Sequence, residues 1–392
     1  MAFAKSTLFN KSPPEEFTPW MNISDIKALF EDKAKVLIAI GGWGDTKGFH
    51  EAVKDEASIE NYAKNVVDMV KKHGFDGVDI DWEYPGSPGE DNPNGDKNIE
   101  IQGFPKFLQA IRSKLDKGKE LTLAVAAGKG GMAAFTPESS PDIWSSVDYI
   151  NVMSYDLAIQ GNNKVSHHTS VKGSLNAVQN YLELGLTPDK INLGFAFYAK
   201  YFTLDPQAKC TPEPFMCTLA PKDSKDGAGA GAAAAGAAGF TKPKITPPPP
   251  ATNVTEDGTC GYLNSLRCPE GACCSAHGQC GNTTAHCGEG CQPQYGKCDA
   301  KIDMDALFRK ALANGRTDDQ QGGRYYVDEE NKLFWTWDST DMMERKFKEI
   351  VREKKLGGIM AWSLGQDSYD WSHLAAMQRG MMEGKGEDKK GQ

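Results

Sequence analysis

The chain has 392 residues, 39% of them hydrophobic, so it can bury a full-sized core and is too long for one small domain. Its formal net charge of −9 and the lack of a dense basic patch exclude a typical nucleic-acid-binding protein. No apolar run approaches the ~18 residues that a membrane span needs, so we expect no insertion into a membrane.

Short apolar runs alternate with amphipathic stretches along most of the chain. The predicted strands are residues 2–6, 35–40, 77–82, 121–126, 148–153, 191–195 and 357–362. The predicted helices between them include residues 59–73, 103–115, 174–186 and 341–354. Strands that alternate with helices pair in parallel, and their number favours an α/β fold of the (β/α)8 TIM-barrel type. The count is about seven strands, whereas a closed barrel of this type has eight.

The strand at residues 77–82 lies in the run Phe-Asp-Gly-Val-Asp-Ile-Asp-Trp-Glu-Tyr-Pro. Asp79, Asp81 and Glu83 alternate in it with apolar residues, so a β-strand places all three carboxylates on one face. Alternate Cα atoms lie about 7 Å apart on a strand, and three charges at that spacing repel one another. One acid is therefore expected to stay protonated near neutral pH, as a general acid requires. An acidic edge strand is the alternative, but the apolar opposite face favours a buried catalytic strand.

The run from Asp79 to Glu83, with its flanks, resembles the D-x-D-x-E signature of the family 18 glycoside hydrolases, the chitinase family. This resemblance covers nearly the whole chain apart from a linker. It implies a (β/α)8 TIM barrel in which residues 2–4 are the second strand and residues 35–45 the third strand with its end. The first strand is then absent from this chain together with a signal peptide. We expect an open barrel that exposes an apolar strand edge.

The resemblance also implies roles for residues at the ends of the strands. Glu83 is the general acid and later the base, Asp81 holds the acetamido group of the sugar, and Asp79 shares a proton with Asp81. Tyr155 and Asp156 orient the acetamido group and line the subsite. The other expected substrate-binding residues are Trp43, Tyr84, Met153, Tyr198 and Trp362. Ordinary core packing is the alternative for the aromatic residues among them.

Two departures from the family pattern concern Asp79. A serine usually stands two residues before the paired glycines, where this chain has Ala39, and a supporting residue from the first strand is also missing. We therefore expect Asp79 to be less well satisfied, with a changed pH optimum or rate but the same reaction. The adjacent His167 and His168 suggest a metal pair, but no third ligand is evident, so we expect them to line the cleft.

A long insertion separates the seventh and eighth barrel strands at residues 200–332. Residues 227–239 are almost entirely Gly and Ala, and a proline run at 247–250 follows, so this part is predicted to be a linker. An alanine-rich helix is the alternative, which the interspersed glycines weaken. Aromatic residues in the second part of the insertion are expected to wall one side of the cleft: Tyr325, Tyr326, Trp335 and Trp337.

The ten cysteines all lie between Cys210 and Cys298, and eight of them lie in the last 39 residues of that span, from Cys260 onward. This density indicates a disulfide scaffold and an oxidising compartment, and the absence of paired C-x-x-C knuckles argues against zinc. The adjacent pair Cys273-Cys274 in this set resembles the hevein-type chitin-binding module. That resemblance implies the pairs Cys260–Cys274, Cys268–Cys280, Cys273–Cys287 and Cys291–Cys298. We expect Cys210 and Cys217 to close a separate loop.

The hevein-like module departs from its family at the sugar-binding positions. A serine and three aromatic residues are usual there, and this chain has Ser275, His277, Gln279 and His286. Glutamine offers no flat ring for a sugar to stack on, and the two imidazoles are small and titrate near pH 6. Weak, acid-sensitive chitin binding through Ser275, His277 and His286 and a purely structural knot both remain open.

These features predict five regions: a first barrel part at 1–209, an insertion and linker at 210–259, the module at 260–298, the insertion remainder with the last strand and helix at 299–380, and a disordered polar tail at 381–392. We expect a secreted, extracellular, monomeric, endo-acting chitinase that cleaves β-1,4 bonds between N-acetylglucosamine units with retention, through an oxazolinium ion. Its partners are then chitin and N-acetylglucosamine oligomers, without cofactor, metal, nucleic acid or membrane. The alternatives are a non-catalytic chitin-oligosaccharide-binding barrel and an endo-β-N-acetylglucosaminidase acting on glycoprotein glycans.

Overall fold

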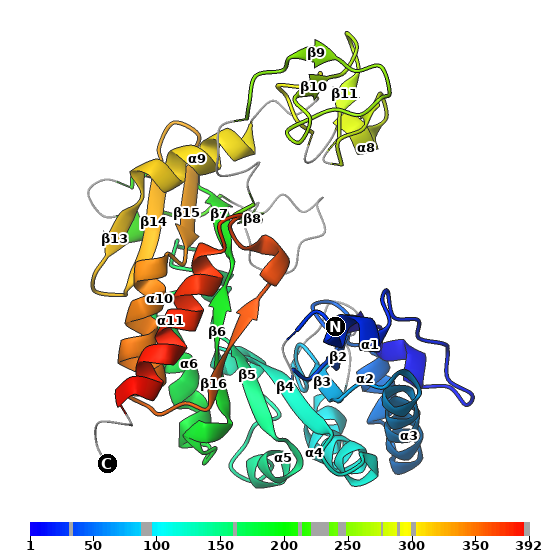
Figure 1. Cartoon of the computed structure of the whole chain (residues 1–392). Coiled ribbons are helices and arrows are strands. Elements are labelled where there is room, and N and C mark those ends of the chain that lie inside the picture. Colours follow the sequence, from blue (N-terminus) through cyan, green and yellow to red (C-terminus); the bar gives the residue numbers. More distant parts are fainter. Residues whose placement is uncertain are drawn as a thin grey trace.

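A computed structural model describes most of the chain and shows an α/β architecture with a second sheet and a small disulfide-rich module (Figure 1). The described residues are 1–30, 34–87, 96–159, 163–210, 214–220, 235–241, 248–275, 277–287, 291–298 and 303–387. Among them, no helix combines the length and the apolar character that crossing a membrane requires.

The main sheet has seven parallel strands, as the sequence predicts. They are β1 (Ala2–Ala4), β2 (Leu37–Gly41), β3 (Gly77–Asp81), β4 (Glu120–Ala126), β5 (Tyr149–Met153), β6 (Ile191–Ala196) and β16 (Gly358–Trp362). Their spatial order is β1-β2-β3-β4-β5-β6-β16, and every neighbouring pair is parallel. Within the described residues, β1 and β16 pair only with β2 and β6 respectively, so the curved sheet is an open barrel.

Helices cover the outer side of this sheet (Figure 1). They are α1 (Ile23–Lys27), α2 (Lys47–Ala52), α3 (Glu56–His73), α4 (Lys97–Lys114), α5 (Ser140–Ser146), α6 (Val171–Glu183), α10 (Thr340–Lys346) with its continuation η6 (Phe347–Arg352), and α11 (Ser372–Glu387). Local chemistry sets the ends of α3, where the Asp55 side chain accepts from the Ser58 amide and Gly74 closes the helix at φ +74°. Short 3₁₀ turns occur at Ser6–Phe9, Lys129–Gly131, Leu157–Ile159, Pro188–Lys190, Pro214–Met216 and Leu364–Gln366.

The barrel core lies between the sheet and its helices. Val78 and Ile80 on β3 and Ile38 and Ile40 on β2 are almost fully buried in it. Burying each of these side chains stabilises the fold by about 1.5–3 kcal/mol. Because side chains alternate along a strand, the same burial turns Asp79 and Asp81 to the opposite face of β3.

The insertion forms a second, antiparallel sheet. Its order is β13 (Arg316–Asp318), β14 (Gly323–Asp328), β15 (Leu333–Trp337), β7 (Tyr198–Thr203) and β8 (Ala235–Gly239), and α9 (Met304–Asn314) packs on it. The prediction of a linker at residues 227–239 is wrong for its last five residues, which form β8; residues 221–234 lie outside the described ranges. Small residues suit β8, because a Cβ on Gly236 would lie 2.2 Å from the Tyr201 hydroxyl oxygen.

The aromatic residues of the insertion pack within it. Trp335 and Trp337 are buried in a cluster with Phe308 of α9, and Tyr325 is buried in another cluster of the insertion. The expectation that these three side chains wall the cleft is therefore wrong. Tyr326 is half-buried and packs against the cluster of Trp335. The second sheet needs its own apolar core, and these aromatic residues supply it.

The disulfide-rich module lies at one end of the molecule, next to α9 (Figure 1). Its short elements are β9 (Asn253–Val254), β10 (Leu266–Arg267), β11 (Cys273–Cys274), β12 (Cys280–Gly281) and α8 (Thr284–Cys287). The disulfides of the chain join Cys210 to Cys217, Cys260 to Cys274, Cys268 to Cys280, Cys273 to Cys287 and Cys291 to Cys298. These are the same five pairs that the sequence analysis expects, and no cysteine is free.

The C-terminal segment differs from its prediction. A disordered tail was expected from residue 381, but α11 continues to Glu387, and residues 388–392 lie outside the described ranges. Met377 of this helix is buried against the barrel core. Apolar contacts therefore hold α11 on the barrel as its last helix.

Candidate active site

Strand β3 carries the acids to the carboxyl end of the sheet. Asp79 and Asp81 lie within the strand, and Glu83 follows two residues after its end. In parallel barrels this edge is where side chains from several strands meet. The structure thus brings the three acids of the motif to one face, with Tyr155 and Asp156 from the end of β5 beside them.

Asp79 is half-buried on β3, and side chains of the two following strands donate hydrogen bonds to it. Its carboxylate accepts hydrogen bonds from the Thr122 hydroxyl and, at 3.3 Å, from the Asn151 amide. Burial raises the pKa of Asp79, and these two hydrogen bonds oppose the shift. Ala39 lies opposite Asp79 on β2 and has no side-chain donor to offer it. The expectation that Asp79 is less well satisfied than in the family stays a prediction. Thr122 on β4 and Asn151 on β5 replace the missing serine, and sequence reasoning missed both.

Asp81 is the acid with the least favourable surroundings. It is 6% exposed, and its Oδ1 atom has no hydrogen-bond partner among the described residues. Burial, together with the nearby charges of Glu83 and Asp79, raises the pKa of Asp81 well above its usual value. Asp81 and Asp79 therefore favour a state in which at least one of them is protonated.

Glu83 has the electrostatics of a general acid. Burial, as the largest cause, and the charge of Asp156 raise its pKa to about 7, against a hydrogen bond from the Tyr84 hydroxyl. That hydroxyl donates to Glu83 Oε2 at 3.0 Å, so Tyr84 lies beside the acid as expected. A carboxyl group with a pKa near 7 keeps its proton in part at neutral pH, and it also accepts one readily.

Asp156 shows the opposite shift. Burial alone would raise its pKa, but contacts with His168 and Lys200 outweigh burial and hold it at about 2. The Lys200 ammonium lies 2.8 Å from Oδ2 and the Tyr198 hydroxyl donates to Oδ1 at 2.8 Å. The nearest His168 ring nitrogen is 3.6 Å from Oδ1, too far for a good hydrogen bond. Asp156 is therefore a fixed negative charge facing Glu83.

Sequence reasoning expected His168 to line the cleft, whereas its side chain is fully buried behind Asp156 and Tyr198. Lys200 was missed because nothing in its local sequence points to Asp156. Its position on β7, two residues after the predicted cleft residue Tyr198 and so on the same face of the strand, was the available signal. His167 is buried in the insertion between Asp318 and Thr336.

Tyr155 lies among the acids. Burial raises the pKa of its hydroxyl, and the charges of Asp81 and Glu83 raise it further. Its ring lies 6.0 Å from that of Tyr198, and its hydroxyl is 3.6 Å from the Met360 sulfur. Met153 ends β5 and is half-buried. Tyr155, which follows β5, and Tyr198, which begins β7, therefore lie near the acids as predicted, and Met360 of β16 is an additional neighbour.

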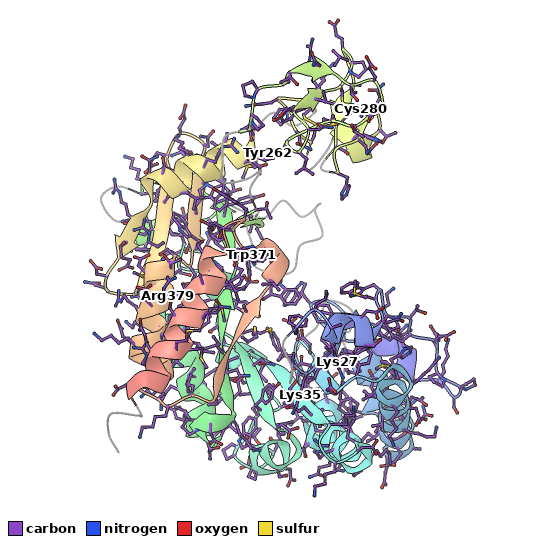
Figure 2. The ribbon with its side chains drawn as sticks, in the orientation of Figure 1. Lys27, Lys35, Tyr262, Cys280, Trp371 and Arg379 are labelled. Carbon is purple, nitrogen blue, oxygen red and sulfur yellow. A yellow bond between two sulfur atoms is a disulfide. The ribbon has the colours of Figure 1, made fainter. Side chains whose placement is uncertain are left out.

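Aromatic residues surround the mouth of the open barrel. Trp362 ends β16 with 39% of its surface exposed, and its ring lies 5.5 Å from that of Phe3 on β1. Gly42 leaves room for Phe3, whose ring is 3.1 Å from the place of a Cβ. Trp43 is 70% exposed, so it lies at the rim and makes no core contact. Sequence reasoning missed Phe3, although its alternation with two alanines was visible. Figure 2 places another exposed aromatic residue, Trp371, near the start of α11.

The residues expected to bind sugar in the module have mixed surroundings. Ser275 is buried, and its hydroxyl accepts from the Gln279 amide at 3.1 Å. His277 is exposed, while His286 is half-buried, close to Thr283 Oγ1 at 2.8 Å. Ser275 is thus committed to the fold of the module, which leaves the two histidines as the accessible members of the set.

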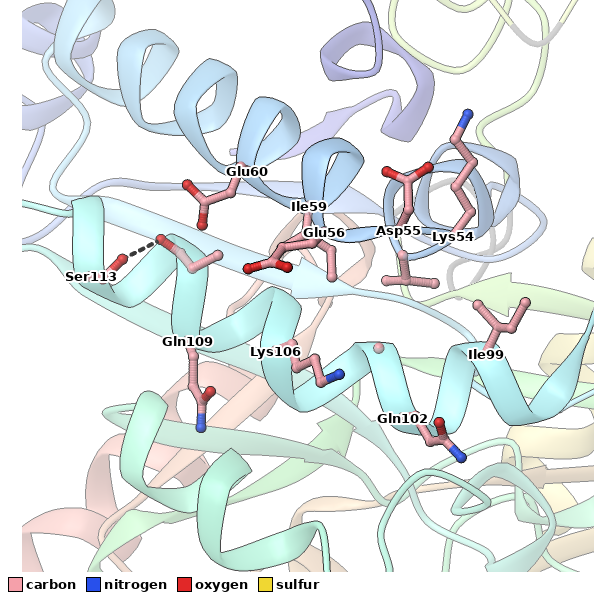
Figure 3. A pocket seen from close by; sticks show the side chains of 13 residues that line it. Lys54, Asp55, Glu56, Ile59, Glu60, Ile99, Gln102, Lys106, Gln109 and Ser113 are labelled. Carbon is pink, nitrogen blue, oxygen red and sulfur yellow. Dashed lines mark hydrogen bonds between the residues drawn. The ribbon is translucent and has the colours of Figure 1, made fainter.

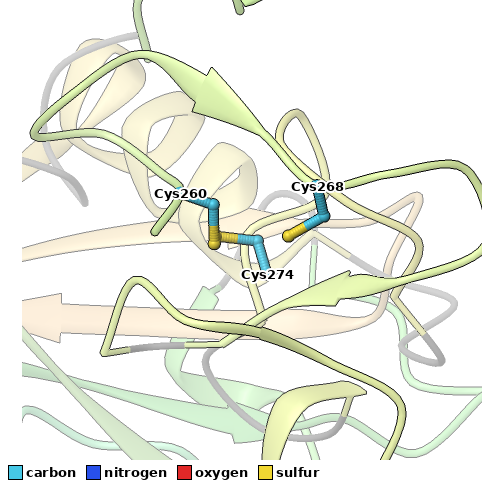
Figure 4. Close-up of side chains that lie close together, drawn as sticks. All are labelled: Cys260, Cys268 and Cys274. Atoms are coloured by element: carbon cyan, nitrogen blue, oxygen red, sulfur yellow. A yellow bond between two sulfur atoms is a disulfide. The ribbon is translucent and has the colours of Figure 1, made fainter. Parts of the chain in front are cut away.

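A close group of cysteine sulfurs in the module is not free to bind metal. The Sγ atoms of Cys260, Cys268 and Cys274 lie within 4.8 Å of one another (Figure 4). All three belong to disulfides, so none is a thiolate ligand. This site gives no support for a bound metal ion.

A groove of about 590 Å³ lies elsewhere, on the outer face of the barrel (Figure 3). Lys54, Glu56 and Glu60 form one wall and Gln102 and Lys106 of α4 the other. None of the acids of β3 lines it. We therefore locate the active site by the carboxylates and not by this groove.

Comparisons with known proteins agree with this site. The family model for glycosyl hydrolases family 18 matches residues 1–367. Endochitinase 1 of Metarhizium robertsii is 30% identical over 241 residues, which cover 59% of this chain and 52% of that protein. Chitinase B of Serratia marcescens is 27% identical over 367 residues, 88% of this chain and 66% of that protein. The chain thus spans about half the length of the first of these relatives.

The fold also matches solved structures. A chitinase from Rhizomucor miehei superimposes with a TM-score of 0.65 at 19% identity, over 97% of this chain and 93% of that one. At this identity the likeness speaks for the fold alone. Together with the acid motif on β3 and a family match over residues 1–367, it leads to one assignment: the chain belongs to glycosyl hydrolase family 18.

Proposed function

We propose that the chain is a chitinase that hydrolyses β-1,4 bonds between N-acetylglucosamine units. The observation that carries this proposal is Glu83, a partly buried acid with a pKa of about 7, at the end of a strand that presents two further acids on the same face. The proteins named as chitinases among its relatives support the choice of chitin. Such an acid can assist cleavage of a glycosidic bond, because the glycosidic oxygen must be protonated before the sugar chain can leave.

The first step is expected to use the substrate as its own nucleophile. Family 18 is an exception among retaining glycosidases, because the carbonyl oxygen of the 2-acetamido group attacks the anomeric carbon. Glu83 donates its proton to the glycosidic oxygen as that bond breaks. The sugar then carries an oxazolinium ion, and the leaving chain departs with the new hydroxyl group.

Asp81 has the role of stabilising this ion. Its buried carboxyl accepts the N–H of the acetamido group, and its unsatisfied Oδ1 atom is available for that bond. Asp79, held by Thr122 and Asn151, shares a proton with Asp81, so the pair need not carry two full charges. Tyr155 faces the same space and orients the acetamido group.

The second step reverses the roles of acid and base. Glu83 is now a carboxylate and takes a proton from water, and the water oxygen attacks the anomeric carbon. The two displacements together retain the anomeric configuration. The fixed charge of Asp156 favours return of the proton to Glu83, since it raises the pKa of that carboxyl. In total, one water molecule is consumed for each glycosidic bond that is broken, and Glu83 ends the cycle protonated as it began.

The sugar at the point of cleavage is expected to rest on Trp362 and Phe3, with Tyr198 and Met153 at its side. Trp43 at the rim is suited to stack on a more distant sugar ring of a long chain. A chain held on both sides of the cleaved bond is consistent with endo action. The mechanism requires an N-acetylated sugar, so cellulose is excluded as a substrate.

The remaining assignments are proposals of the same kind. We infer a secreted, extracellular, monomeric protein, because its disulfides suit an oxidising compartment and fungal chitinases are among its relatives. The module at residues 260–298 is proposed to be of the hevein type, with His277 and His286 as its accessible sugar contacts. The barrel parts at residues 1–209 and 299–380 are proposed to form one catalytic domain, interrupted by the insertion.

The test is hydrolysis of N-acetylglucosamine hexamer, with proton NMR following the anomer of the fresh product. Early β-anomer from the wild type and none from Glu83→Gln is the expected result. Early α-anomer would contradict the retaining mechanism. Full activity of Glu83→Gln would contradict the assignment of the acid.

The same assay separates the alternatives. A protein that binds the hexamer, as measured by calorimetry, but releases no product would be a binding barrel. Release of glycans from a glycoprotein, with the hexamer left intact, would identify an endo-β-N-acetylglucosaminidase. Glu83, the acid that follows β3, favours a hydrolase over the first of these alternatives.

A further inference from the structure

A buried polar cluster lies behind the acid strand and takes no part in the chemistry described above. It consists of Thr46, which precedes α2, His50 in the last turn of α2, and Glu100 in the first turn of α4. His50 Nδ1 lies 2.6 Å from Glu100 Oε1, a close polar contact without the alignment of a hydrogen bond. His50 Nε2 lies 2.6 Å from the Thr46 hydroxyl oxygen. Glu100 is only 4% exposed, which is unusual for a glutamate and requires partners.

The second oxygen of Glu100 reaches the segment that carries the general acid. Its Oε2 atom accepts a hydrogen bond of 2.8 Å from the backbone N–H of Gly86, three residues after Glu83. Charge-assisted hydrogen bonds of this kind are stronger than neutral ones. A side chain at position 86 would displace this contact, because a Cβ there would lie 2.6 Å from the Ile101 side chain. The backbone after Glu83 is thus held directly against α4.

The same cluster also contacts the residue before Glu83. The His50 ring lies 5.6 Å from the Trp82 ring and meets it edge to face. Trp82 also stacks on Phe49 at 5.3 Å, and it is almost fully buried. One cluster therefore fixes both ends of the segment from Trp82 to Gly86, and Glu83 lies between them.

Helix α4 is placed to hold Glu100 in this position. The Asp96 side chain caps the helix by accepting from the amides of Asn98 and Ile99. Glu100 then lies in the first turn, where a carboxylate is favoured by the helix dipole. Glu56 also lies in the first turn of its helix, α3, but its side chain is exposed.

We propose that Glu100, supported by His50 and Thr46, is a positioning residue that sets the location of the Glu83 carboxyl relative to the departing oxygen. The proposal rests on the proposed role of Glu83 as general acid. Glu100 itself touches neither the substrate nor the reacting atoms. Its contribution is geometric, since a displacement of about 1 Å at a reacting group lowers a rate by about a hundredfold.

A structural role alone predicts a different result, and leaving groups distinguish the two. A misplaced acid slows the departure of a poor leaving group, such as a sugar hydroxyl, which needs a proton. A dinitrophenolate leaves without a proton, so its release is insensitive to where Glu83 lies. A protein that is merely less stable loses activity on both kinds of substrate in equal proportion.

The experiment measures kcat and KM of the full chain on aryl chitobiosides with leaving groups of increasing pKa and on N-acetylglucosamine tetramer. For Glu100→Leu we expect kcat on the tetramer to fall by about tenfold to a hundredfold. The dinitrophenyl substrate is expected to lose less than about threefold in kcat/KM, which reports only the steps up to release of the leaving group and not the later attack of water. The dependence of log kcat/KM on leaving-group pKa therefore steepens. KM is expected to change little. An unchanged dependence, or equal losses on all substrates, would overturn the proposal.

Matched variants complete the design. Glu100→Gln keeps an acceptor for the Gly86 N–H, so its dependence on leaving-group pKa is expected to stay close to that of the wild type. Glu56→Leu is the control for the loss of a first-turn glutamate. If Glu100→Leu does not fold, His50→Phe removes the support of Glu100 while it keeps a ring against Trp82. It is expected to steepen the dependence to a smaller extent, and no steepening would overturn the proposal.

Glu83→Gln separates this inference from the proposed function. If it steepens the dependence and Glu100→Leu does not, the acid role stands and the positioning role fails. If Glu83→Gln leaves the dependence unchanged, the acid role itself fails.

Discussion

The acid face of the barrel and the disulfide-rich module are stabilised in opposite ways. At the carboxyl end of β3, three acids are held in surroundings that raise their pKa values, which costs folding free energy and supplies reactivity. The module has a small core of Cys260, Cys268, Cys274 and Tyr295, and four disulfides hold it together. The barrel has a large apolar core whose folding free energy offsets the cost of the buried acids. The module has only a small core and depends on its disulfides.

Reduction of the disulfides is expected to have the largest effect, and chiefly on the module, which holds four of the five bonds; the fifth joins Cys210 to Cys217 in the insertion. Each native disulfide of a small domain contributes about 2–5 kcal/mol to folding, more than so small a core supplies. In a reductant we expect protease to cleave residues 248–298 while the barrel stays intact. Mass spectrometry of the fragments checks this, with hydrolysis of soluble oligomers as a readout of the barrel. Loss of barrel activity at the same reductant concentration would contradict the separation.

The next effect concerns Asp81. Asp81→Asn is expected to lower kcat by about a hundredfold to a thousandfold, the usual result of removing one group that stabilises a charged transition state. Its melting temperature is expected to stay the same or rise, because a buried acid with a raised pKa is removed. Ile80→Ala, on the opposite face of the same strand, is the control and is expected to cost about 2–5 kcal/mol of stability. A similar loss of stability in Asp81→Asn and Ile80→Ala would contradict the view that the acid face of β3 serves reactivity and its apolar face serves stability.

The pH dependence is a smaller effect that reports on Glu83 itself. The folded protein raises the pKa of Glu83 to about 7, so its proton is present below that pH and lost above it. We expect kcat/KM to be supported below pH 7 and to fall up to about tenfold per pH unit above it. Tryptophan fluorescence over the same range serves to exclude unfolding. A profile that is flat between pH 6 and about 9 would contradict the acid role.

The smallest effect is expected in the module. Replacing the exposed His277 with Trp adds a flat ring at a position where hevein-type modules carry one, and we expect about fivefold tighter binding to chitin beads, or about 1 kcal/mol. The measurement uses the Glu83→Gln background so that the beads are not digested. Leu263→Trp is the control, because Leu263 is 96% exposed and outside the expected binding set. Equal gains from both changes would indicate nonspecific adsorption.

The sequence predicted those parts of the fold that depend on local periodicity. The alternation around Asp79 and Asp81 gave the strand and its reactive face, and the strand and helix pattern gave the barrel. It failed for residues 235–239, because Gly and Ala have little strand propensity and form β8 only where Tyr201 needs small neighbours.

The site residues that were missed share one property, which is that their partners are distant in sequence. Thr122 and Asn151 replace the family's serine from neighbouring strands, and Lys200 reaches Asp156 from 44 residues away in the chain, that is, 200 minus 156. Glu100 bonds Gly86 across 14 residues, part of them outside the described ranges. Such pairs depend on the packed sheet and helices, and no local pattern encodes them.

The two unpaired edges of the main sheet have a consequence for the order in which the barrel exchanges its amide protons with solvent. A closed barrel has no end strand, whereas here β1 and β16 each have one side without a neighbour among the described strands. Local opening starts where backbone groups lack partners. We therefore expect deuterium to enter the sheet from β1 and from β16 and to reach the middle strand β4, which carries Thr122, last, with β3 and its acid pair exchanging only shortly before it.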